Sequence, residues 1–98
     1  MNLKKELEEK KLTIELEGRV DTTTAPELDA AIKEDIENIE ELVIDMAKLE
    51  YISSAGLRVL LSAQKELNNK GTMIVTKVDP SVMEVFEITG FDKVLNIQ

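Results

Sequence analysis

The chain has 98 residues, of which 43% are hydrophobic, and 20 acidic against 12 basic residues give it a formal net charge of −8. This length predicts one domain, residues 1–98, and the apolar fraction excludes wholesale disorder. The negative charge and the low aromatic content (one Tyr, two Phe, no Trp) speak against binding nucleic acid or an anionic membrane surface.

Cysteine and histidine are both absent. Disulfides, thiolate or imidazole metal sites, and cysteine or histidine catalysis are therefore excluded. The first residues lack the apolar core of a signal peptide, and no apolar run approaches the roughly 20 residues that span a bilayer. We expect a cytoplasmic protein without membrane insertion, metal or cofactor.

Two strands are predicted at the start of the chain. Residues 12–17 alternate apolar and polar side chains, as a strand with one buried face does. A less clear strand, residues 3–8, precedes it, and the polar residues 9–11 form the turn between them. This pattern predicts a hairpin.

A helix and a buried strand follow. Residues 24–27 have the hydroxyl-x-x-Glu form of a capping box, and Pro26 is tolerated in a first turn. Apolar residues every four positions then predict a helix to about Asn38, with Leu28, Ile32 and Ile36 buried. The fully apolar residues 42–44 predict a strand at the centre of a sheet, covered on both faces.

The second half repeats this alternation. A helix starts at Ser53 and buries Leu57, Leu60, Leu61 and Leu67, and Gly71 offers it a left-handed cap. Residues 73–75 predict another buried strand. Asp79 caps a third helix that buries Val82, Val85 and Phe86, and residues 94–95 add a short strand or helical turn.

Strands that are joined through single helices form parallel pairs with right-handed crossovers. The predicted fold class is therefore α/β: one small domain with a central, mostly parallel sheet, an antiparallel first strand, and flanking helices.

Ser54 is the candidate functional residue. Ser53 is placed to cap the helix, and Ser54 falls in the first turn, beside free N–H groups and the positive end of the helix dipole. A phosphoryl group would be stabilised there. The alternative interpretation of residues 53–56 is a well-capped helix start without further function.

Four segments, in order and with matching spacing, resemble the STAS domain family of bacterial anti-sigma factor antagonists. Residues 16–25 are similar to the family's G-x-[IVL]-D segment, and residues 43–45 to its strand ending in aspartate. Residues 51–57 are similar to its D-S-[SA]-G-L segment, and residues 82–94 to its L-T-G-L-D-x-[VI] segment. The resemblance covers nearly the whole chain.

In this family, the serine after the motif aspartate is phosphorylated by a serine kinase that is also the anti-sigma factor. The matching position here is Ser54. The resemblance implies that the unphosphorylated chain binds the kinase and frees the sigma factor, that phosphorylation releases the kinase, and that a metal-dependent serine phosphatase resets the cycle. The resemblance places Asp21 near the switch serine. The predicted partner-binding surface contains Asp21, Thr22, Ser53, Ser54, Ala55, Gly56 and Arg58.

Ser53 departs from the family's motif, which usually has aspartate at this position. Serine caps a helix as well as aspartate does, so the fold should not change. The carboxylate beside the switch serine is nevertheless gone, and Ser53 itself is an alternative phosphate acceptor. This departure favours a second function, a STAS domain that works without phosphorylation in a lipid-transport or stressosome-type assembly.

Four other residues each allow two interpretations. Asp21 either lines the partner surface or caps the following turn. Asp45, after the strand at 42–44, lies either at a ligand site or accepts loop N–H bonds. Gly56 allows a close approach by a partner or a neighbouring strand, or is only a mild helix penalty. Arg58 either contacts the phosphate or the partner, or lies on a solvated helix face.

No enzyme class is favoured. The phosphate-binding and dinucleotide-binding glycine motifs are missing, as is a nucleophile elbow. Ser54 also has no histidine to activate it. We predict a binding protein and not an enzyme.

Overall fold

Four strands form one sheet in the order β1-β2-β3-β4, and the computed structural model describes all of residues 1–98. The elements along the chain are β1 (Asn2–Glu8), β2 (Lys11–Val20), α1 (Ala25–Asp35), a 3-10 turn (Ile36–Asn38), β3 (Glu41–Ile52), α2 (Ser54–Leu67), β4 (Thr72–Thr76), α3 (Pro80–Thr89) and a second 3-10 turn (Phe91–Lys93). None of these helices is long and apolar enough to cross a membrane.

The sheet is mixed. β1 and β2 form the predicted antiparallel hairpin, and β3 runs parallel to both β2 and β4. The predicted α/β fold class is thereby confirmed. Of the two alternatives predicted for residues 94–95, the helical turn is the one found, because the N–H groups of Val94 and Leu95 both donate to the carbonyl oxygen of Phe91. The last strand-like contact is made by Ile97, which bridges to Val75 of β4.

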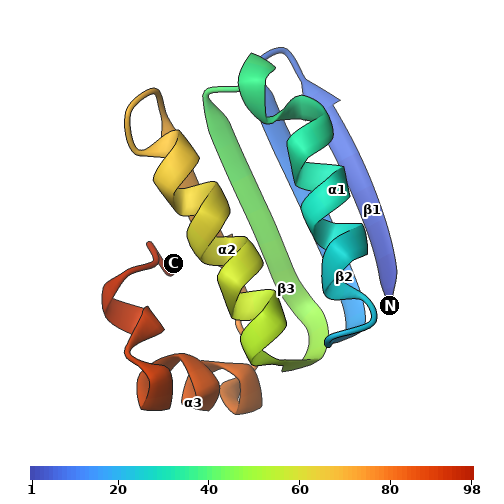
Figure 1. The fold of residues 1–98 in the computed structure, drawn as a ribbon, viewed down its shortest axis with the longest axis vertical. Coiled ribbons are helices and arrows are strands. Elements are labelled where there is room, and N and C mark those ends of the chain that lie inside the picture. Colours follow the sequence, from blue (N-terminus) through green and yellow to red (C-terminus); the bar gives the residue numbers. More distant parts are fainter.

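Both crossover helices cover the same face of the sheet (Figure 1). Because the strand order advances in one direction, right-handed crossovers place α1 and α2 on one side. The prediction that the central strands are covered on both faces was wrong. Alternate residues of β3 and β4, such as Val43 and Ile74, are only half-buried, since they point to the uncovered face.

The core lies between this sheet and its helices. It contains 23 buried residues, all of them hydrophobic, and no polar or charged residue is buried. α3 contributes Val82 and Phe86, both fully buried, at the end of the sheet. Its predicted cap is confirmed, because Oδ2 of Asp79 accepts a hydrogen bond from the Ser81 N–H at 3.0 Å.

Strand β3 is much longer than the sequence predicted. The buried residues follow strict alternation up to Met46 and then come three apart, at Leu49 and Ile52. Two register shifts against β2 cause this change, because each inserts one extra residue into β3. Asp45 therefore lies in the middle of a strand and not at its end.

The end of α2 also differs from the prediction. Gly71 does not adopt the left-handed conformation that was expected of a cap. A Cβ atom at this position would lie 1.8 Å from the carbonyl oxygen of Glu40. Gly71 therefore permits a close approach of two backbone segments.

Candidate functional site

The candidate site lies where β2 and β3 end. Because these strands are parallel, the loop after β2 and the start of α2 emerge at the same edge of the sheet (Figure 1). The N–H of Ser53 donates a hydrogen bond to the carbonyl oxygen of Val20 at 2.8 Å. Ser53 and Ser54 are thus fixed beside the loop that contains Asp21 and Thr22.

Asp21 organises that loop. Its Oδ1 accepts hydrogen bonds from the N–H groups of Thr24 and Thr23, both at 3.0 Å. These bonds, the one from Thr24 first, hold the pKa of Asp21 below its ordinary value, because they stabilise the ionised carboxylate. Of its two interpretations, the structure shows the turn-capping one.

The predicted capping box at residues 24–27 was wrong. The Thr24 side chain caps no helical N–H. Its hydroxyl accepts a hydrogen bond from the Asp21 N–H at 2.9 Å and donates to the carbonyl oxygen of Arg19 at 3.0 Å. Asp21, three residues earlier, supplies the side-chain cap for this turn.

The two adjacent serines have different environments. Ser53 is the N-cap of α2: its backbone is extended, and its Oγ accepts from the Gly56 N–H at 3.5 Å, the long end of hydrogen-bond distances. Ser53 is half-buried, whereas Ser54 is exposed. Capping therefore accounts for Ser53 and leaves the hydroxyl of Ser54 without a partner in the chain.

Gly56 packs beneath these serines. It is buried, and a Cβ atom there would lie 2.7 Å from side-chain carbons of both Ile52 and Val20. Such distances are far inside van der Waals contact, so the first turn of α2 rests directly on the ends of β2 and β3. Gly56 supports the surface and does not form part of it.

A shallow groove of about 390 Å³ runs between α1 and α2, next to the serines. It is lined by Thr22, Ala25, Pro26, Asp29, Lys33, Ala55, Arg58, Val59 and Ser62. Three predicted partner-binding residues, Thr22, Ala55 and Arg58, are thus brought together. The groove itself was not predicted, because it depends on the spacing between two helices.

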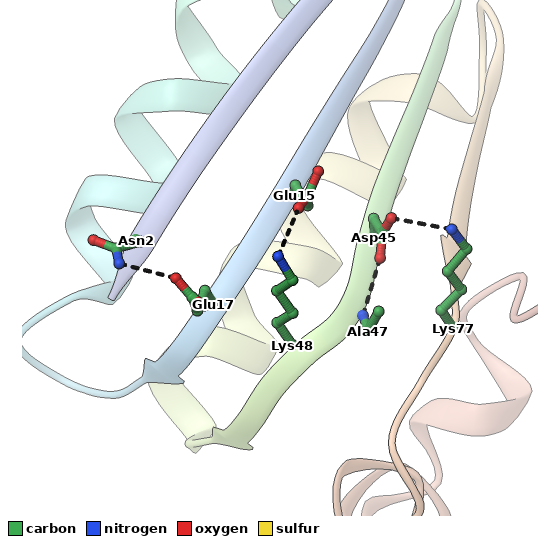
Figure 2. Close-up of polar contacts among 7 residues, drawn as sticks. All are labelled: Asn2, Glu15, Glu17, Asp45, Ala47, Lys48 and Lys77. Atoms are coloured by element: carbon green, nitrogen blue, oxygen red, sulfur yellow. Dashed lines mark hydrogen bonds and ion pairs between the residues drawn. The ribbon is translucent and has the colours of Figure 1, made fainter.

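Asp45 lies apart from this site. It points to the uncovered face, where its Oδ1 accepts from the Ala47 N–H at 3.0 Å and its Oδ2 lies 3.5 Å from Nζ of Lys77 (Figure 2). The same face carries a contact between Lys48 and Glu15 at 3.8 Å. Asp45 therefore makes local backbone and charge contacts, and the ligand-site interpretation has no support.

Sequence reasoning missed one contact near the site. The guanidinium carbon of Arg19 lies 4.4 Å from the ring centroid of Tyr51, in a cation–π contact. The two residues are register partners at the ends of β2 and β3. Only the register after two shifts brings them together, so the sequence held no usable signal for this pair.

Comparison with known proteins decides the family. The profile of the STAS domain matches residues 2–98. The chain belongs to the STAS domain family. This STAS domain chain is 41% identical over 78 residues to BtrV of Bordetella bronchiseptica, which is named as an anti-sigma factor antagonist; the match covers 78% of this chain and 67% of BtrV. It is 31% identical over 102 residues to the anti-sigma F factor antagonist of Paenibacillus polymyxa, covering 99% and 87% of the two chains.

The fold is shared with SpoIIAA, an anti-sigma factor antagonist solved in two states. Its unphosphorylated form matches this STAS domain with a TM-score of 0.86 at 21% identity, covering 99% of this chain and 88% of SpoIIAA. The phosphorylated form, described as a Bacillus cell fate determinant, matches with a TM-score of 0.78 at 20% identity, covering 99% and 91%. At this level of identity, the similarity concerns the fold alone.

Proposed function

We propose that this STAS domain protein is an anti-sigma factor antagonist. It binds a serine-kinase anti-sigma factor, frees a sigma factor for transcription, and is released when the kinase phosphorylates Ser54. Two named antagonists among its relatives support the general function. The observation that carries the switch is the exposed hydroxyl of Ser54, without a partner, at the first position of α2.

The position of Ser54 suits reversible phosphorylation. The first N–H groups of a helix have no carbonyl partner within it, and the helix dipole favours negative charge there. The fold should therefore accept a phosphate. A partner packed over Ser54 would instead meet about −1.5 to −2 charges in a desolvated contact, which opposes binding.

Ser54 is a better acceptor than Ser53. The Ser53 side chain is half-buried and caps the helix, so a kinase would have to break this contact to reach it. Exposed residues around Ser54 extend the contact surface for the partner to the Asp21 loop and to Arg58. A metal-dependent serine phosphatase would return the protein to its binding state.

A second function is a STAS domain that acts without phosphorylation, in a lipid-transport or stressosome-type assembly. The observation that favours it is Ser53 in place of the motif aspartate, which leaves no carboxylate beside Ser54. A neighbouring gene for a serine-kinase anti-sigma factor would support the first function, and neighbouring genes for transporter subunits the second.

The test is to recover the binding partners of the tagged protein from its own cells and to identify them by mass spectrometry. The proposal expects a serine-kinase anti-sigma factor that stays bound without ATP and is released when ATP is added. The Ser54→Ala variant should keep the kinase in both conditions. Recovery of transporter subunits and no kinase would favour the second function.

A further inference from the structure

Arg58 differs from the other cations around the candidate site. Lys33, across the groove, is paired with Asp29 at 3.1 Å, and Arg19 stacks over Tyr51. Arg58 is exposed, and it makes no hydrogen bond, ion pair or cation–π contact in the chain. Of the two cations that line the groove, Arg58 is the one without an anionic partner in the chain.

Arg58 is also placed to reach Ser54. The two residues are four positions apart on α2, so they lie on the same face of the helix, with Cβ atoms about 5–6 Å apart. Arg58 lines the groove that Ala55 borders at the Ser54 end. Ser54 itself does not line the groove, so Arg58 is the residue that connects the groove with the Ser54 hydroxyl one helical turn away.

Charge defines the kind of partner that fits here. The chain as a whole carries a net charge of −8, which repels acidic surfaces. α2 is an exception, because it contains Arg58 and Lys65 against a single acidic residue, Glu66. An acidic segment of a partner would be attracted to this helix and repelled by most of the remaining surface.

We propose that Arg58 couples the phosphorylation of Ser54 to the release of the partner. The Arg58 guanidinium binds a carboxylate of the partner in the groove when Ser54 is unmodified. It binds the phosphate when Ser54 is phosphorylated. This inference rests on the proposed function and assigns its electrostatic mechanism to one residue. A guanidinium binds carboxylates and phosphates with the same planar pair of N–H donors, so the two anions compete for it.

The competition favours the phosphate. The phosphate on Ser54 is part of the same chain and carries about −1.5 to −2 charges, against −1 for a carboxylate. When it captures Arg58, the partner's carboxylate loses its counter-ion and faces a second anion. Phosphorylation then removes an attraction and adds a repulsion at one point of the contact.

The first arm of the test needs no partner. Phosphoserine is incorporated at position 54 during synthesis, and the second pKa of the phosphate, about 6, is followed by ³¹P NMR at low ionic strength. Arg58→Gln should raise this pKa by about 0.3 unit or more, whereas Lys65→Gln, the same change on the same helix, should leave it unchanged. The helix terminus is common to all variants, so its effect cancels. Equal pKa values for the wild type and Arg58→Gln would overturn the proposal.

The second arm measures binding of the copurified kinase to the unphosphorylated protein by calorimetry. Arg58→Glu should weaken binding at least tenfold and Lys65→Glu less than twofold, with circular dichroism as the fold control. Similar losses for both variants would overturn the role of Arg58.

If Ser54→Asp still weakened binding in that case, the proposed function would stand without the role of Arg58. Absence of a kinase partner would count against the proposed function, and the first arm would still decide whether Arg58 binds the phosphate.

Discussion

The N–H of Ser53 donates to the carbonyl oxygen of Val20 at 2.8 Å, which joins the N-cap of α2 to the end of β2. This bond fixes the candidate switch serine relative to the loop that Asp21 organises. Gly56 adds a second constraint, because its lack of a side chain lets α2 rest on both strands. A charge on Ser54 is therefore expected to act on a bound partner and not by loosening the helix.

Replacing Ser54 by alanine should abolish phosphorylation. Incubated with its kinase and ATP, the wild-type protein should gain one phosphate, and Ser54→Ala none, because Ser53 is half-buried and occupied in capping. Intact-mass spectrometry followed by peptide mapping measures this. Phosphate on another residue, or none on the wild type with a kinase that does bind, would contradict the proposed switch.

Replacing Ser54 by aspartate should separate folding from binding. A carboxylate near a helix N-terminus changes stability by a few tenths to about 1 kcal/mol in the favourable direction. Kinase binding should weaken at least tenfold, or about 1.4 kcal/mol. Thermal unfolding and calorimetric titration measure the two effects. An unfolded variant would show that Ser54 is structural, and an unchanged affinity would place the binding surface elsewhere.

Replacing Gly56 by alanine should destabilise the protein. The added methyl group would lie 2.7 Å from carbons of Val20 and Ile52, and overpacking of this kind costs about 1–3 kcal/mol. The better helix propensity of alanine returns at most about 1 kcal/mol. Urea unfolding at pH 7 should show a lower midpoint, whereas Ser62→Ala, at an exposed position of α2, should stay within about 0.5 kcal/mol. Wild-type stability of Gly56→Ala would contradict the packing described here.

Replacing Asp21 by asparagine should make the free energy of unfolding less dependent on pH in acid. The pKa of Asp21 is lower in the folded protein than its ordinary value of 3.8, so its contribution is complete above the unfolded-state pKa. That contribution is lost as the pH falls through the lower folded-state pKa. Asparagine can cap the same turn without titrating. The stability advantage of the wild type over Asp21→Asn should therefore shrink between about pH 4.5 and pH 2. Urea unfolding at several pH values measures this difference. A constant difference in the free energy of unfolding between the two proteins across this range would contradict the assigned role of Asp21.

Most of the fold could be predicted because the spacing of apolar residues follows secondary structure directly. The hairpin, the three helices and the parallel strands all came from this signal. The second half of β3 could not be predicted, because Leu49 and Ile52 are three residues apart and the alternation is lost. The uncovered face was missed as well, since half-buried residues such as Val43 and Ile74 are as apolar as core residues.

The candidate site was predictable to the extent that it depends on local chemistry. Ser53 as a cap and Ser54 as the exposed hydroxyl follow from the rules for helix starts. The groove and the Arg19–Tyr51 contact depend on helix spacing and on strand register, which no short stretch of sequence encodes. The free state of Arg58 likewise becomes visible only when the partners of the neighbouring cations are known.

The two register shifts in β3 have a consequence for insertions and deletions in this family. Each shift adds one residue to β3. Together the two shifts determine that the side chain of Ile52 points into the core at the position where α2 begins. Deleting one residue between Met46 and Tyr51 would turn Ile52 toward the uncovered face and carry Ser53 and Ser54 away from the Asp21 loop. Viable homologues should therefore keep a constant number of residues from Met46 to the start of α2.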